Sequence, residues 1–248
     1  MDMRDINQLE YINLGKFSEK ELDEMLSFSY SLNNLSSRID YLSSKLLDID
    51  YKEKTLIGEE DEREVFVVNL EFLDCLTFLE YVEAMRLSRC YKEFVSNLKK
   101  VRYIRGIVSY ETRNHFFTDW IESNAERIID MTCDVGGGYT LKINKFINLR
   151  EDNTNFVSGV PVKKRNINYI PKNCIDRRIL ERLKTGDYIG IYSELEGLDV
   201  SHVGIFISKD GEYRFRHASS KIGIRKVIDQ DFLEYINNKP GIIILRPY

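Results

Sequence analysis

The chain contains few of the residues that bind metal ions or cross-link a fold. Its 248 residues include four cysteines, at positions 75, 90, 133 and 174, and only three histidines. No two cysteines have the CxxC spacing of a zinc knuckle, and disulfide frameworks belong mainly to smaller secreted domains. We therefore expect isolated free thiols, no metal site and no cofactor.

Long apolar runs and blocks of one charge are also missing. No stretch approaches 18 consecutive apolar residues, so no segment is expected to span a membrane. The net charge is −4, and the lysines and arginines are scattered, which argues against a nucleic-acid partner. The N-terminal "MDMRDINQLEYINLG" lacks a basic segment followed by an apolar one. We expect a cytoplasmic protein if this N-terminus is native, or an exported one whose signal peptide was removed.

The first 50 residues predict helices. In "FSEKELDEM", Ser18 is a candidate N-cap and Glu21 completes a capping box. One apolar helical face follows, formed by Leu35, Ile39, Leu42 and Leu46. Residues 51–64 are polar and indicate a loop, "EVFVVN" (64–69) indicates a strand, and 72–87 has the apolar spacing of a helix.

The second half has a different character. Helices are expected at 115–130, at 174–186 and in "DQDFLEYINNKPG". After residue 130, short β-type runs alternate with turn residues, and Asp210-Gly211 marks a hairpin turn. We expect "DVGGGYT" (134–140) to be a flexible loop or hairpin and "VKKRNINY" to be an exposed turn. Helices followed by an antiparallel-type sheet predict an α+β fold, with 1–248 as one domain and 1–48 as its N-terminal helical part.

Cys75 lies in "LDCLTFLE", at the start of the predicted helix. With Asp74 as N-cap, the free backbone N–H groups of the first turn surround the sulfur. Such a position is expected to lower the thiol pKa and to offer donors for an oxyanion. Taken alone, the residue is more simply read as a small buried core residue.

Two histidines accompany adjacent strands. His202 begins the apolar run "SHVGIFIS", and His217 ends the run after the hairpin turn. Because antiparallel neighbours place these positions roughly opposite each other, the two imidazoles are expected to be neighbours. Each alone reads as a packed core histidine, but with Cys75 they form the pattern of a nucleophile, a base and an orienting group.

These motifs resemble the NlpC/P60 superfamily of papain-like cysteine amidases. "SHVGIFISKDGEYRFRHAS" is similar to its "HVGIY…G…HAS" hairpin, and "LDCLTFLE" to its Asp-Cys helix start. The DUF1460 branch, the N-acetylmuramoyl-L-alanine amidase-like proteins, is the closer resemblance. It is carried by "LDCLTFLEYVEAMRL", "RYIRGIVSYETRNHFFTDWIESN", "GDYIGIYSELEGLDVSHVGI" and "GIIILRP", and it extends from about residue 38 to the end.

The resemblance implies a catalytic helix packed on an antiparallel sheet. It implies Cys75 as nucleophile, His202 as base and His217 as the orienting residue. The implied substrate is a peptidoglycan fragment, a small or 1,6-anhydro muropeptide, cut between N-acetylmuramic acid and L-Ala. Such a substrate favours the cell envelope, periplasmic or secreted, as the compartment.

Further residues are candidates for substrate binding. Arg113 can pair with a muropeptide carboxylate or form an internal salt bridge, and His115 can shape the pocket. Trp120 is assigned to the core. The remaining candidates are Tyr110, Asp199, Ser201 and, by position before the catalytic helix, Tyr51.

Other functions remain open at this stage. The same triad serves a D-Glu–diaminopimelate endopeptidase, an acyltransferase or a deamidase. A catalytically silent muropeptide-binding module is also consistent with the fold. Zinc hydrolysis is disfavoured, because two of the three histidines are assigned as partners of the thiol.

Overall fold

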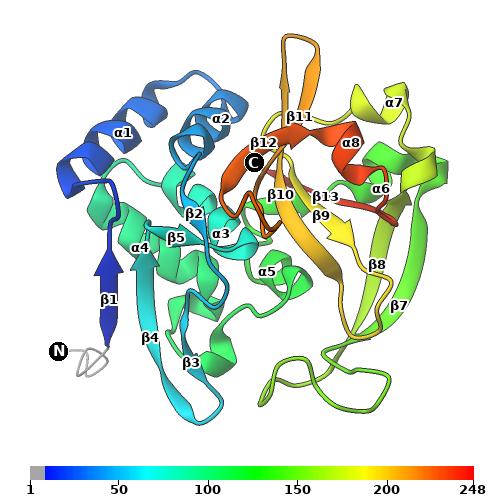
Figure 1. The fold of residues 1–248 in the computed structure, drawn as a ribbon, viewed down its shortest axis with the longest axis horizontal. Helices are drawn as coiled ribbons and strands as arrows, with labels where there is room; N and C mark the ends of the chain where they lie inside the picture. Colours follow the sequence, from blue (N-terminus) through cyan, green and yellow to red (C-terminus); the bar gives the residue numbers. More distant parts are fainter. Residues whose placement is uncertain (1–8) are drawn as a thin grey trace.

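The computed structural model describes residues 9–248, so the first eight residues of the predicted N-terminal helical part lie outside it. A group of helices on one side and a large antiparallel sheet on the other enclose a central helix, α3 (Cys75–Arg86) (Figure 1). The predicted α+β class is confirmed. None of the helices in this range is long and apolar enough to cross a membrane.

Three helices pack around α3: α1 (Glu19–Ser31), α2 (Leu35–Lys45) and α4 (Tyr91–Arg102). The capping box at Ser18 is confirmed, because the Ser18 hydroxyl accepts from the Glu21 N–H and the Glu21 carboxylate accepts from the Ser18 N–H. Ile39, Leu42 and Leu46 are buried, as their spacing predicts. Packing on all sides explains why α3 exposes almost none of its surface after its first turn.

Short strands extend this helical part. β1 (Glu10–Asn13), β4 (Glu62–Asn69) and β3 (Ile57–Glu59) form one small sheet, and β2 (Asp50–Tyr51) pairs with β5 (Phe72–Leu73). The expectation of a loop over 51–64 is therefore wrong, and so is the purely helical interpretation of the first 50 residues. β1 obtains its hydrogen bonds from β4, some 55 residues later, so local periodicity does not reveal it.

The large sheet has eight strands, and every pairing in it is antiparallel. Its order is β12 (Val227–Asp231), β11 (Glu212–Ala218), β10 (Val200–Lys209), β9 (Tyr188–Tyr192), β13 (Gly241–Pro247), β8 (Lys163–Pro171) and β7 (Leu141–Ile147), with β6 (Ile128–Asp130) beside β13. The predicted hairpin turn is confirmed: Asp210 and Gly211 both have positive φ, at 52° and 82°.

Several predicted boundaries in the second half are wrong. The helix expected over 115–130 is only α5 (Phe117–Ser123), because the chain then turns at Asn124 and continues as β6. The helix ends there because the residues of β6 pair with the C-terminal strand β13. The basic stretch expected as an exposed turn begins β8, where Lys163 and Arg165 bind the Asp119 carboxylate.

The remaining short elements lie at the sheet ends. The glycine-rich 134–140 segment is not a loop: it contains α6 (Thr132–Gly136) and the 3-10 turn η3 (Gly137–Tyr139). A Cβ at Gly136 would meet the Thr140 hydroxyl at 2.3 Å, so close packing requires this glycine. The helix expected over 174–186 is reduced to η4 (Lys172–Cys174) and α7 (Arg177–Leu180). Elsewhere lie η1 (Ile104–Gly106), η2 (Tyr110–Thr112) and α8 (Phe232–Ile236).

Candidate active site

The first turn of α3 places Cys75 where the sequence predicts it. Asp74 is the N-cap: its Oδ1 accepts from the N–H of Thr77 at 2.8 Å, and the Thr77 hydroxyl accepts from the Asp74 N–H at 3.0 Å. Thr55 adds a third hydrogen bond, from its hydroxyl to Asp74 Oδ2 at 3.0 Å. Cys75 is therefore the first helical residue, held by a rigid capping box.

The predicted low pKa of the thiol is wrong. Burial raises the pKa of Cys75 to about 12, and the neighbouring Asp74 carboxylate raises it further. Backbone N–H groups of Val203, Cys75 and Leu76 hydrogen-bond the sulfur and act in the opposite direction. Desolvation outweighs the helix terminus here, so the resting residue is a neutral thiol that needs a base.

The two predicted histidines meet on the β10–β11 hairpin. His202 Nε2 and His217 Nδ1 are 2.8 Å apart, and the rings are nearly perpendicular. Ile205 pairs with Arg216, so His217 lies diagonally across from His202 rather than directly opposite. The sequence-based expectation of neighbouring imidazoles is confirmed.

Both imidazoles are neutral near pH 7. Burial lowers the pKa of His202 to about 3, and the nearby His217 and Lys239 lower it further. Burial also lowers the pKa of His217 to about 4. A neutral imidazole retains one lone pair, and His202 Nε2 already contacts His217. Nδ1 of His202 can accept a proton in the tautomer in which Nε2 carries the hydrogen and donates it to His217 Nδ1.

A pocket of about 350 Å³ joins the thiol to this pair. Cys75 and His202 both line it, together with the start of β10 and the segment before α5. Its other lining residues are mostly apolar: Leu76, Phe116, Phe117, Phe156, Val157, Leu198, Val200 and Val203. A thiol, a neutral imidazole and backbone N–H donors thus face one partly apolar space.

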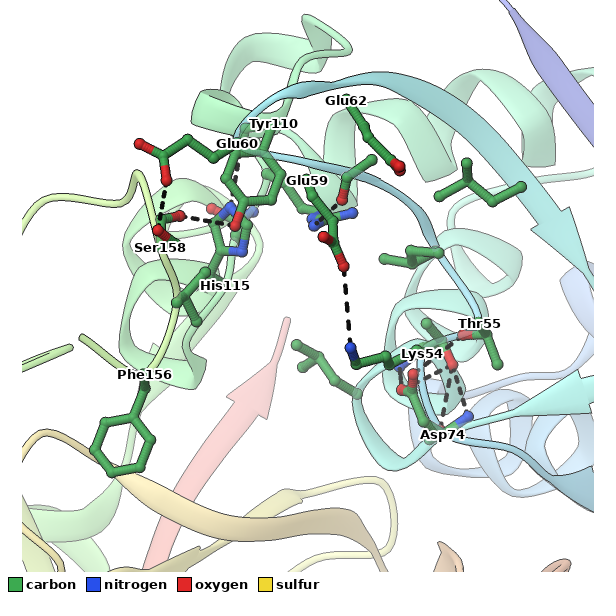
Figure 2. Close-up of a pocket in the computed structure, with 18 of the residues that line it drawn as sticks. Lys54, Thr55, Glu59, Glu60, Glu62, Asp74, Tyr110, His115, Phe156 and Ser158 are labelled. Atoms are coloured by element: carbon green, nitrogen blue, oxygen red, sulfur yellow. Dashed lines mark hydrogen bonds and ion pairs between the residues drawn. The ribbon is translucent and has the colours of Figure 1, made fainter. Parts of the chain in front are cut away.

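A larger, polar pocket of about 940 Å³ lies beside the first turn of α3 (Figure 2). Tyr110, His115 and Ser158 form one wall, and Lys54, Thr55 and Asp74 lie opposite them. The two pockets share four lining residues, Leu76, His115, Phe156 and Val157. The two pockets therefore adjoin each other next to the first turn of α3.

Comparison with known proteins identifies the family. The profile of the N-acetylmuramoyl-L-alanine amidase-like (AmiA-like) family matches residues 41–242. The chain belongs to this family. No protein with a curated description matches the sequence significantly.

Solved structures share the fold of this amidase-like chain. A protein of Legionella pneumophila from family DUF1460 has a TM-score of 0.75 at 22% identity, covering 92% of this chain and 95% of its own. An N-acetylmuramoyl-L-alanine amidase of Bacteroides uniformis has a TM-score of 0.71 at 24% identity, with 92% and 99% covered. A Bacteroides fragilis structure described as a putative xylanase has 0.68 at 28%, with 82% and 98% covered.

In the amidase-like chain, Arg113 makes internal contacts at the edge of the polar pocket. Its guanidinium lies 3.2 Å from the Glu64 carboxylate, donates to the Gly58 carbonyl at 3.1 Å and stacks on the Tyr110 ring. The Tyr110 hydroxyl donates to the Ser158 carbonyl at 2.9 Å. Both residues line the pocket, but their functional groups already have partners that fix its wall.

His115 occupies the junction of the two pockets. Its Nε2 donates to the Tyr110 carbonyl at 2.7 Å, and burial lowers its pKa to about 4. A carbonyl can only accept, so the other ring nitrogen carries a lone pair. The hydrogen bond to Tyr110 thus makes Nδ1 of His115 the nitrogen that can accept. Trp120 is fully buried, as predicted.

The other predicted binding residues differ in role. Asp199 is buried and accepts from the N–H and hydroxyl of Thr118 at 2.6 and 2.8 Å, so it ties the β10 approach to α5. Ser201 is exposed and lines the thiol pocket. Burial raises the pKa of Tyr51 to about 12, and proximity to Cys75 contributes. Tyr51 thus lies near the thiol but does not line either pocket.

Sequence reasoning missed two residues beside the imidazole pair. The Tyr235 ring, from α8, lies 4.8 Å from the His217 ring and 6.0 Å from the His202 ring. The Lys239 ammonium lies 5.3 Å from the Tyr235 ring. Their segment has only the pattern of a short helix, and no local signal indicates that it covers the histidines.

Proposed function

We propose that the protein is a cysteine amidase that hydrolyses the amide between N-acetylmuramic acid and L-Ala in small or 1,6-anhydro muropeptides. One observation carries the proposal: Cys75 and His202 line one pocket, and His202 is hydrogen-bonded to His217. Membership of the amidase-like family and the named Bacteroides uniformis amidase support the substrate class. We also assign the fold to the NlpC/P60 papain-like superfamily.

The geometry supports a general-base mechanism. His202 Nδ1 takes the proton of the Cys75 thiol as the sulfur attacks the lactyl carbonyl carbon, and a tetrahedral oxyanion forms. Backbone N–H groups around the sulfur stabilise that oxyanion. The C–N bond then breaks, and His202 returns the proton to the departing L-Ala amine. Water, deprotonated by His202, attacks the thioester, releases the acid and restores the thiol.

Product masses test the bond. We expect digestion of a purified anhydro-muropeptide to yield a peptide-free anhydro-sugar product and an intact stem peptide with a free L-Ala amine. Cleavage between D-Glu and diaminopimelate would instead leave L-Ala-D-Glu on the sugar and establish the endopeptidase alternative. An unchanged substrate that binds the protein would establish the binding module. Mass spectrometry separates all three outcomes, and reducing-end muropeptides tested in parallel give the sugar preference.

The protonation states predict an unusual pH profile. A neutral thiol and a neutral imidazole coexist between the His202 pKa of about 3 and the Cys75 pKa of about 12. We therefore expect kcat/KM to stay nearly constant from pH 5.5 to 9.5 wherever the protein remains folded. A thiolate–imidazolium pair would instead lose activity as its imidazolium deprotonates, at roughly pH 8 to 9. Assays of kcat/KM at each pH distinguish the neutral pair from the thiolate–imidazolium pair. Circular dichroism at the same pH values shows where the protein remains folded.

A further inference from the structure

The His202–His217 pair has one unsatisfied nitrogen. His217 is 2% exposed, and its Nδ1 contacts His202. Its Nε2 is buried without an aligned hydrogen-bond partner among residues 9–248. A buried polar atom without a partner is destabilising, so such an atom in the centre of a candidate active site requires an explanation.

The proposed mechanism defines which atom must carry a proton. If His202 Nδ1 is to accept the thiol proton, the resting His202 carries its hydrogen on Nε2 and donates it to His217 Nδ1. His217 is then protonated on Nε2. His217 Nε2 is therefore an N–H donor that needs an acceptor nearby, and this step rests on the proposed function.

Strand pairing places one carboxamide beside that donor. His217 on β11 pairs with Ile228 on β12. Gln230 lies two residues further along β12, so it is on the same face of the sheet as His217 and is its diagonal neighbour. Gln230 is half-buried. Asp229, which lies between Ile228 and Gln230 in the sequence, faces the opposite side of the sheet. Its carboxylate accepts from the Arg216 guanidinium at 2.7 and 2.8 Å.

We propose that Gln230 is a positioning residue of the active site, whose Oε1 accepts from His217 Nε2–H and thereby fixes the tautomers of both imidazoles. The relay runs from Gln230 through His217 and His202 to the Cys75 thiol. The Gln230 amide acts on the His217 pKa as a hydrogen-bond partner, which raises it against the larger effect of burial.

An uncharged acceptor suits this place. Two charged groups also act on the His217 pKa: Asp229 raises it and Lys239 lowers it. A carboxylate at position 230 would favour the imidazolium form of His217, which donates from Nδ1 to His202 Nε2. The hydrogen of His202 would then lie on Nδ1, the nitrogen that must receive the thiol proton. A glutamine orients His217 without adding that charge.

Two variants of similar size test the role. We expect Gln230→Met, which has no acceptor, to lower kcat about 10- to 100-fold at every pH with KM unchanged. Gln230→Glu keeps an acceptor, so its kcat should approach that of the wild type at high pH. On acidification its kcat should fall at a higher pH than the kcat of the wild type does. Thermal unfolding of each variant is measured in parallel.

The rate of Cys75 alkylation by iodoacetamide, read by peptide mass spectrometry, gives a second readout that needs no substrate. It should follow the same pattern. If the wild type cleaves no muropeptide but alkylation follows the pattern, the amidase proposal fails and the role of Gln230 stands. The assignment would be overturned if Gln230→Met had the kcat and the alkylation rate of the wild type. It would also be overturned if both variants lost the same activity at all pH values.

Discussion

Cys75→Ala is expected to abolish amide hydrolysis, with kcat reduced by on the order of 10⁶. The variant keeps the α3 capping box, since that box uses Asp74 and Thr77 and not the sulfur. It loses the only thiol that lines the His202 pocket. Stability should therefore change little while the covalent route disappears. Product formation from an anhydro-muropeptide, followed by mass spectrometry over hours, measures the loss.

The other three cysteines provide matched controls. Cys90→Ala, Cys133→Ala and Cys174→Ala change thiols that lie away from both pockets, and each should retain wild-type kcat. Cys75→Ala should still bind the muropeptide in calorimetry, because the cleft walls remain. Residual turnover within about tenfold of the wild type in Cys75→Ala would eliminate the cysteine mechanism even if the amidase activity itself is real.

Arg102→Met is expected to destabilise the fold by about 3–5 kcal/mol, because it leaves the buried Glu80 carboxylate, which belongs to α3, without its ion-pair partner. Arg102 Nε lies 2.6 Å from Glu80 Oε2, and its Nη1 donates to the Val67 carbonyl at 2.6 Å. The two side chains are 0% and 1% exposed. Burial raises the pKa of Glu80, so without Arg102 the carboxyl protonates more readily. The loss should be larger at pH 8 than at pH 5.

Urea unfolding compares this variant with a surface pair. Arg177 and Glu181 are 2.7 Å apart but 88% and 55% exposed, so Arg177→Met should unfold at nearly the same urea concentration as the wild type. The double variant Glu80→Leu with Arg102→Met removes both charges and should recover much of the stability. If Arg102→Met unfolds at the wild-type urea concentration, the pair does not hold α3 in place.

Local patterns were sufficient where neighbouring residues make the structure. The Ser18 capping box, the Asp74 cap and the Asp210-Gly211 turn each close their hydrogen bonds within about four residues. Such features can be predicted from the sequence because the groups that satisfy each other are adjacent in it. The predicted positions of Cys75 and the two histidines rest on these elements.

Distant partners decided the rest. The 115–130 helix was cut short because β6 pairs with the C-terminal strand, and β1 exists only through β4. The assignment of Arg113 was equally open, since its partner Glu64 lies 49 residues away. A local pattern contains no information on a group that arrives from another part of the chain.

By itself, the sequence determined that a cysteine begins a capped helix and that two histidines occupy adjacent strands of one hairpin. Only the tertiary structure decided the chemical state of these groups. A helix terminus is a local property and favours a thiolate, but the burial that shifts the pKa values of Cys75 and His202 comes from segments far apart in the chain. Desolvation outweighs the local dipole, and the pair is neutral for that reason.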